Sequence, residues 1–165
     1  MAVSTSAFNV HERLLPATAS EVGALIDTLA TPGDLLWPGD DWPRMSLDNG
    51  LTPGSKGGHG PVRYTVTSYV PDKWVRFTFS GPRGFDGFHE LTVHAVDDGR
   101  TVLRHTLAMK VRGPALLTWP LMYRSCHDAV LEDALDRAES ALTGKVARPA
   151  RWSWYVRLLR RLAPR

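Results

Sequence analysis

Hydrophobic and polar positions alternate along several segments of this chain of 165 residues. Such alternation is typical of strands that bury one face, because successive side chains point to opposite sides of a strand. The pattern predicts strands at 7–17, where Pro16 ends the first one, and at 62–70, 74–80, 88–96 and 101–111. The connections "PDK" and "DDGR" are short enough for hairpins, which indicates antiparallel pairing.

A first helix is predicted at 18–30, where apolar residues recur at helical spacing. Thr18 can cap this helix, and Glu21 stands three residues later, which is the pattern of a capping box. The punctuated segment that follows predicts a short second helix at 34–37, a short strand at 44–49 and a glycine-rich loop at 50–61.

A long helix is predicted at 115–144, a segment rich in Ala, Leu, Asp and Glu. Gly144 is a natural stop, and Pro120 is expected to kink the helix or to mark its first turn. The order of strand, two short helices, antiparallel strands and one long helix predicts an α+β fold. A curved sheet must cover its apolar face, and this helix is the only predicted element large enough to do so.

The hairpin from 88 to 111 contains three of the six histidines. A three-residue loop at 98–100 would place Val93 opposite His105 and would put the apolar sets of both strands on one face. In this arrangement His89 and His105 point toward the helix, together with Leu91, Val93, Leu107 and Met109. His94 points to the outside.

One face of the long helix continues this group of candidates. His127 and Arg124 lie on or beside the apolar face by spacings of three, four and seven, and Trp119 and Tyr123 lie toward the helix start. The aromatic residues of the preceding hairpin are expected in the core or the pocket wall. The candidate ligand-binding side chains are therefore His89, Leu91, Val93, His105, Leu107, Met109, Trp119, Tyr123, Arg124, His127, Tyr64 and Phe77.

The order of elements, the hairpin "VRYTVTSYVPDKWVRFTFS" and the hairpin "FHELTVHAVDDGRTVLRHTLAM" resemble the START/Bet v 1-like superfamily, also described as polyketide cyclase/dehydrase and lipid-transport proteins. The resemblance covers about residues 8–143. It implies a helix-grip fold, in which an antiparallel sheet wraps the C-terminal helix around a hydrophobic cavity. Members bind lipids, steroids or polyketides, and some are cyclases, aromatases or hydrolases. The superfamily shares no catalytic motif, so the resemblance implies a cavity and not a mechanism.

The expected function is therefore binding of an apolar small molecule in an internal cavity. The alternative is an enzyme of the polyketide cyclase or aromatase type, in which His89, His105 or His127 works with Arg124 or Tyr123. No catalytic residue and no cofactor are assigned. No metal is expected either, because histidine spacings of 16 and 22 without a cysteine cluster do not match a structural zinc site.

Charge divides the chain into a ligand-binding domain at 1–144 and a tail at 145–165. The net charge is +3, but all 17 acidic residues lie in the first part, whereas the last 21 residues hold seven Lys or Arg and no acid. From Arg151 to Arg165 the tail has the composition of an amphipathic interfacial helix. It is expected to contact a membrane surface, to dock on its own domain or to pair two copies in a homodimer, and a nucleic-acid partner is not expected.

The N-terminus has neither the basic nor the apolar region of a signal peptide, and the single cysteine, Cys126, excludes an intramolecular disulfide. These features fit a cytoplasmic protein, peripheral at the membrane where the tail binds one.

Overall fold

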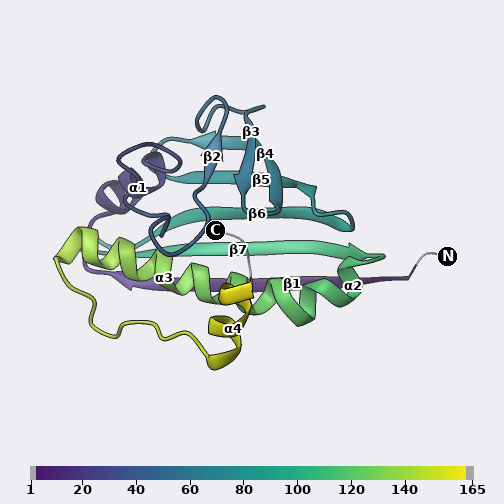
Figure 1. The fold of residues 1–165 in the computed structure, drawn as a ribbon. Coiled ribbons are helices and arrows are strands. Elements are labelled where there is room, and N and C mark those ends of the chain that lie inside the picture. Colours follow the sequence, from purple (N-terminus) through teal and green to yellow (C-terminus); the bar gives the residue numbers. More distant parts are fainter. Residues whose placement is uncertain (1–2, 163–165) are drawn as a thin grey trace.

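A computed structural model describes residues 3–162 and contains a curved sheet of seven antiparallel strands (Figure 1). The strands lie in the order β1-β7-β6-β5-β4-β3-β2. Their bounds are β1 (Ser4–Leu15), β2 (Ser46–Leu47), β3 (Lys56–His59), β4 (Val62–Val70), β5 (Trp74–Gly81), β6 (Phe85–Asp97) and β7 (Arg100–Arg112). The α+β fold with a curved sheet and a long C-terminal helix is confirmed.

The helices are α1 (Ala19–Asp27), α2 (Ala115–Thr118), α3 (Arg124–Thr143) and α4 (Trp154–Leu162). The capping box of α1 is present as predicted, with Thr18 and Glu21 bonded to each other's backbone N–H. Gly144 ends α3 in the left-handed conformation (φ 74°). Pro120 lies in η1 (Trp119–Tyr123), one π-helical turn that joins α2 to α3.

The second short helix predicted at 34–37 is wrong. The carboxylate of Asp34 accepts the backbone N–H groups of Leu36 and Trp37. This side chain holds the backbone in a turn and competes with helical hydrogen bonding, as short acidic side chains often do.

The glycine-rich segment at 50–61 is not a loop throughout, because it contains β3. This strand pairs with β2 on one side and with β4 on the other. A Cβ atom on Gly57 would lie 1.9 Å from the carbonyl oxygen of Ser46. Glycine therefore lets two neighbouring strands approach each other here.

The register predicted for the β6–β7 hairpin is wrong by two residues. The turn has two residues, and Asp97 pairs with Arg100. Val96 is an extra residue that forms a bulge, so Leu91 lies opposite His105 and Val93 lies opposite Leu103. Because the error is even, each side chain keeps the face expected for it.

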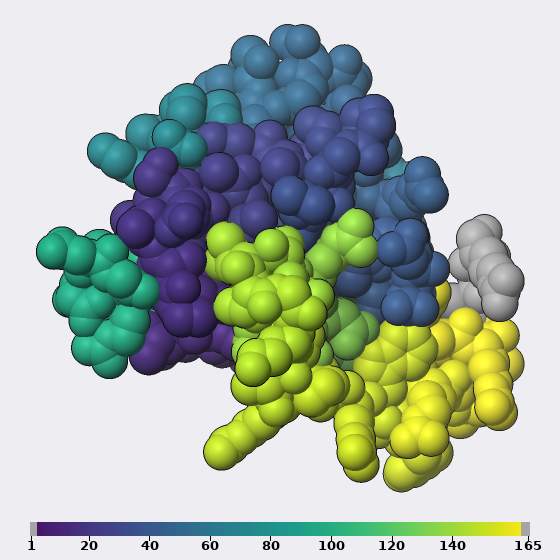
Figure 2. All heavy atoms as spheres, turned by 90° about the vertical axis from the view of Figure 1, so that its left-hand side faces the viewer, coloured from purple at the N-terminus to yellow at the C-terminus, as the bar shows by residue number. Residues whose placement is uncertain are grey.

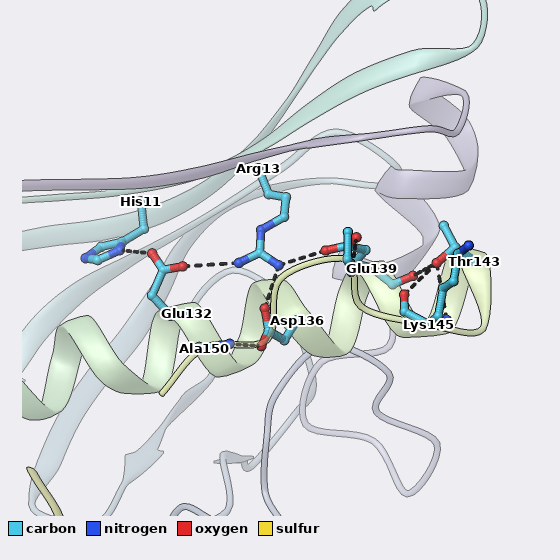
Figure 3. A network of polar contacts seen from close by, with 9 residues as sticks. His11, Arg13, Glu132, Asp136, Glu139, Thr143, Lys145 and Ala150 are labelled. Atoms are coloured by element: carbon cyan, nitrogen blue, oxygen red, sulfur yellow. Dashed lines mark hydrogen bonds and ion pairs between the residues drawn. The ribbon is translucent and has the colours of Figure 1, made fainter. Parts of the chain in front are cut away.

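The polar side of α3 does not face only solvent (Figure 3). The guanidinium of Arg13 on β1 lies 2.5 Å from Asp136, 2.9 Å from Glu139 and 3.1 Å from Glu132 on α3. His11, two residues earlier on the same strand face, contacts Glu132. The long helix therefore packs its apolar side on the main core and its acidic side on the polar face of β1.

The tail is docked on the rest of the chain as far as residue 162, and residues 163–165 lie outside the described part. Val156 of α4 is buried, and the indole of Trp152 donates to Asp133 on α3. Arg160 donates to the carbonyl oxygen of Asp41 and stacks on Trp42. Figure 2 shows α4, in yellow, beside the blue segment that follows α1.

Candidate functional site

Two buried histidines on neighbouring strands form the centre of the candidate site. The Nδ1 atom of His89 on β6 lies 3.2 Å from the Nε2 atom of His105 on β7. His89 is 8% exposed and His105 is 4% exposed. Both lie on the sheet face that is covered by α3, as the strand alternation predicts.

Aromatic side chains enclose His89. Its ring stacks on Phe77 and Phe79 at centroid distances of 4.9 and 5.0 Å, and Tyr64 meets its edge at 4.9 Å. Burial in this apolar wall lowers the pKa of His89 and of His105 well below the ordinary value, and the nearby histidines lower it further. Both imidazoles are therefore neutral at physiological pH.

The hydrogen bond fixes what the pair can offer to a ligand. A neutral imidazole carries one N–H and one bare nitrogen. If His89 donates, its Nε2 atom is an acceptor and the Nδ1 atom of His105 is a donor; if His105 donates, the two roles are exchanged. These two outer nitrogens, like the hydroxyl of Tyr64, are buried and have no hydrogen-bond partner among the described residues. The pair therefore always presents one donor and one acceptor.

A small internal cavity of about 30 Å³ adjoins the pair. Its walls come from the sheet, from α3 and from the segment that follows α1. The lining residues are Leu29, Leu36, Trp37, Met45, Phe77, His89, Leu91, His105, Leu131, Ala134 and Leu135. A water molecule needs about 10–15 Å³ of such volume, so the space is large enough for about two waters.

Two further histidines extend the group toward β1. His127 on α3 lies with its ring 5.2 Å from that of His105 and 6.0 Å from that of His11. The Nε2 atom of His11 lies 3.1 Å from Asp128, and its Nδ1 atom lies 2.7 Å from Glu132. Burial alone would lower the pKa of His11, but the hydrogen bonds to Asp128 and Glu132 outweigh it and raise that pKa.

His59 joins this group of histidines through Tyr64, which packs on both His59 and His89. Its ring packs on Trp37 at 4.5 Å and on Tyr64 at 5.8 Å, and burial lowers its pKa to about 3. Only His94 of the six histidines is exposed on the outer side of the sheet.

No protein-family model matches this sequence, and no curated protein matches it either. Solved structures do match. Norcoclaurine synthase from Thalictrum flavum, in complex with dopamine and hydroxybenzaldehyde, is 15% identical with a TM-score of 0.63, over 86% of this chain and 90% of that one. A protein from Thermobifida fusca is 16% identical with a TM-score of 0.63, over 82% and 92%. CalU16 from Micromonospora echinospora is 14% identical with a TM-score of 0.57, over 96% and 92%.

The chain has the helix-grip fold of the START/Bet v 1-like superfamily. The fold implied by the resemblance of the two hairpins is thus confirmed.

Within this helix-grip fold, four of the twelve candidate side chains line the cavity, namely Phe77, His89, Leu91 and His105. Tyr64 packs on His89, and His127 packs on His105. Leu107, Met109 and Trp119 belong to a separate apolar cluster around Phe85. Val93 and Tyr123 are half-buried beside the main core.

Arg124 is exposed and does not join the other candidates. Arg124 is the first residue of α3, and helical spacing from His127 and Leu131 does not bury a side chain that stands at the end of the helix. Sequence reasoning also missed His11, Asp128 and His59 as neighbours of the candidate histidines. For His11 a signal existed, since it alternates with Asn9 and Arg13 on one face of the first predicted strand.

Proposed function

We propose that this protein binds a small, mostly apolar molecule with one polar group in the cavity between the sheet and α3. The observation that carries the proposal is the pair of partnerless nitrogens on His89 and His105. An unpartnered buried polar group costs about 1–3 kcal/mol, and a hydroxyl or carbonyl group of a ligand would relieve that cost. The remaining walls are apolar, as in most small-molecule sites.

The ligand must be small, or it must displace part of the wall. The cavity of about 30 Å³ is far below the roughly 300–1,000 Å³ of ordinary ligand pockets. Leu36, Trp37 and Met45 close it from a segment with little regular secondary structure. Movement of that segment would enlarge the space without breaking the sheet. Norcoclaurine synthase, which has the same fold, holds dopamine and hydroxybenzaldehyde, and both are small aromatic molecules with polar groups.

The test begins with native mass spectrometry of the protein purified from its own cells, followed by denaturing extraction of any bound molecule. Hydroxybenzaldehyde is then titrated as a probe while the histidine side-chain NMR resonances are recorded. We expect the resonances of His89 and His105 to shift on binding and that of His94 to stay. The proposal fails if nothing co-purifies and the probe moves neither resonance.

A matched pair of variants locates the binding. Ala134 lines the cavity, whereas Ala141 lies on the exposed side of the same helix. Ala134→Val adds two methyl groups to the cavity and should weaken binding by about tenfold or more, a loss of about 1.4 kcal/mol. Ala141→Val has the same effect on helix propensity and should leave binding unchanged. Equal effects of the two variants would contradict a cavity site.

Proton transfer by the same pair is the alternative, an activity of the cyclase or aromatase type. A neutral imidazole can accept a proton, and burial of His89 and His105 keeps water away from the reacting group. In that case His89→Gln should abolish turnover of the co-purified molecule class while it is still bound. Unchanged turnover in this variant would show that His89 is not the acid or base, and absence of turnover in the wild type would leave binding as the function.

For the tail, we propose contact with an anionic membrane surface. On α4, Trp154 is 74% exposed, Leu158 and Leu162 are exposed, and Arg157 and Arg161 lie beside them. Apolar rings with flanking arginines suit the headgroup region of anionic lipids. No helix in the described range 3–162 is both long and apolar enough to cross a membrane.

Vesicle sedimentation tests this contact. The protein should bind vesicles that contain phosphatidylserine and not vesicles of phosphatidylcholine alone, and salt should weaken the binding. Trp154→Ser combined with Leu158→Ser should abolish it, whereas Phe8→Ser, which changes an exposed ring on β1, should not. A variant that changes the oligomeric state in solution but not vesicle binding would show that the surface pairs two copies instead.

A further inference from the structure

Three potential metal ligands meet where β1 packs on α3. They are His11 from the strand and His127 and Asp128 from the helix, and one ligand atom of each lies within 4.8 Å of the others. The Oδ1 atom of Asp128 lies 3.1 Å from Nε2 of His11 and 3.6 Å from Nδ1 of His127. Strand and helix thus bring together residues that are more than a hundred positions apart in the sequence.

These separations suit a tetrahedral metal. Zinc binds histidine nitrogen at about 2.0–2.1 Å and carboxylate oxygen at about 2.0–2.2 Å, which places neighbouring ligand atoms roughly 3.3–3.5 Å apart. The two distances at Asp128 lie on either side of this range. The ligand atoms of His11 and His127 lie within 4.8 Å of each other, so rotation of these two side chains would bring the three ligands to a common centre.

The residues around the group also match a metal site. The Nδ1 atom of His11 lies 2.7 Å from Oε1 of Glu132, and a proton on Nδ1 leaves the lone pair of Nε2 free to bind a metal. A carboxylate behind a histidine ligand is a common arrangement in zinc proteins. Asn9 donates to Oδ1 of Asp128 at 2.9 Å and so helps to fix the orientation of that carboxylate.

His127 supplies an independent observation. Both of its ring nitrogens are buried, and neither has a hydrogen-bond partner in the described part of the chain. An ion pair of protonated His11 with Asp128 and Glu132 would satisfy those three groups without any metal, but Nδ1 of His127 would still lie 3.6 Å from Asp128, beyond hydrogen-bond distance. A metal ion beside Asp128 would give the nearer ring nitrogen, Nδ1 of His127, a partner.

We propose that His11, His127 and Asp128 bind a divalent transition metal, with Zn²⁺ as the best match to two imidazoles and one carboxylate. Three protein ligands leave the fourth position of a tetrahedral ion open to water or to a ligand atom. The side chain of Asp128 is 39% exposed, so solvent reaches its carboxylate. The site is separate from the cavity, although the ring of His127 lies beside that of His105.

Metal titration of the full chain, made without a histidine tag and stripped with a chelator, tests the proposal. We expect one equivalent of Zn²⁺ to bind, as measured by calorimetry. We also expect Co²⁺ to give the intense visible absorption of a tetrahedral site. Both signals should persist in His94→Gln, which removes the exposed histidine. Both should weaken by about 100-fold or more in His127→Gln, since that variant removes one of three ligands.

Two further variants keep the test decisive if His127→Gln fails to fold. Asp128→Asn changes a half-exposed group and should weaken Zn²⁺ binding to a similar extent. Glu132→Gln should weaken it by about 10–100-fold, because Glu132 acts through His11. The proposal is overturned if the wild-type chain binds less than one equivalent, or if folded Asp128→Asn binds as tightly as wild type.

Discussion

The Nδ1 atom of His89 lies 3.2 Å from the Nε2 atom of His105, and both imidazoles are buried between the sheet and α3. This contact needs one proton between the two rings, so both rings can be neutral and still be paired. If both rings were protonated, the two N–H groups would face each other and the contact would be repulsive. The pair is therefore stable only while at least one ring remains unprotonated.

Acid should destabilise this protein more steeply than histidine content alone suggests. His59, His89 and His105 have lowered pKa values in the folded state, so below about pH 6.5 the unfolded chain binds protons that the folded chain does not bind. The free energy of unfolding therefore falls as the pH falls, by up to about 1.4 kcal/mol per pH unit for each such histidine. Urea unfolding between pH 7 and pH 5, with a chelator present, measures this slope.

The variant His89→Gln should reduce that slope by the contribution of about one proton, because it removes one group that titrates in the unfolded state. We expect this reduction even if the variant is less stable than wild type at pH 7. His94→Gln is the control, since His94 lies exposed on the outer side of the sheet. Equal slopes in wild type and His89→Gln would mean that His89 is protonated in the folded protein.

Arg13 should be one of the most important polar residues for stability. It joins Glu132, Asp136 and Glu139 of α3, and its side chain is only 18% exposed. Arg13→Ala leaves three neighbouring carboxylates without their cation and should cost about 2–4 kcal/mol in urea unfolding. Arg104→Ala is the matched control, because Arg104 pairs with Glu12 at exposed positions and should cost less than about 1 kcal/mol. Similar costs for the two variants would refute a special role for Arg13.

The first strand shows where sequence patterns reach their limit. Its exposed face holds the apolar residues Phe8, Val10 and Leu14, whereas its covered face holds Asn9, His11 and Arg13. Alternation alone cannot distinguish the two faces, because the covered face is apolar only at Ala7 and Leu15, and its polar middle matches the acidic side of α3. The sequence of each element predicts whether it forms a strand or a helix. The contact between β1 and α3 depends on tertiary packing and cannot be predicted from either segment alone.

The hairpin of β6 and β7 shows the opposite case. Its predicted register was wrong because Val96 forms a bulge, which no local residue pattern announces. The inward positions of His89 and His105 were nevertheless correct, since an even shift preserves the face of every residue. The side of the sheet to which a residue points is thus predicted more safely than its partner on the next strand. The cavity volume could not be predicted, because it depends on side chains such as Trp37 that come from an irregular segment.

Two phenylalanine variants should differ strongly in stability, because β1 exposes an apolar ring to solvent. Phe8 is 73% exposed, whereas Phe77 is almost fully buried in the core. Phe77→Ala should lower the free energy of unfolding by about 3–5 kcal/mol, because it removes buried surface and leaves a cavity. Phe8→Ala should change it by less than about 0.5 kcal/mol, as surface substitutions generally do. A large loss in Phe8→Ala would mean that another surface covers this ring in solution.

Asp133 should hold the tail on the domain. Its Oδ2 atom accepts the indole N–H groups of both Trp42 and Trp152, each at 2.7 Å, and so joins α3 to the segment after α1 and to the segment before α4. Asp133→Ala removes both hydrogen bonds and leaves two partly buried N–H donors without their acceptor, at about 1–3 kcal/mol for each donor. The variant should therefore favour release of the tail more than it favours unfolding of the whole domain, because the sheet does not depend on these contacts.

Limited trypsin digestion measures this release. Lys145 and Arg151 lie in the connecting segment, so cleavage there should become at least about tenfold faster in Asp133→Ala, while the fragment that ends near residue 144 stays protected. Asp40→Ala is the control, since it breaks an exposed contact with Arg137 and leaves the two indoles bonded. If cleavage accelerates equally throughout the chain, Asp133 stabilises the whole domain and not the tail in particular.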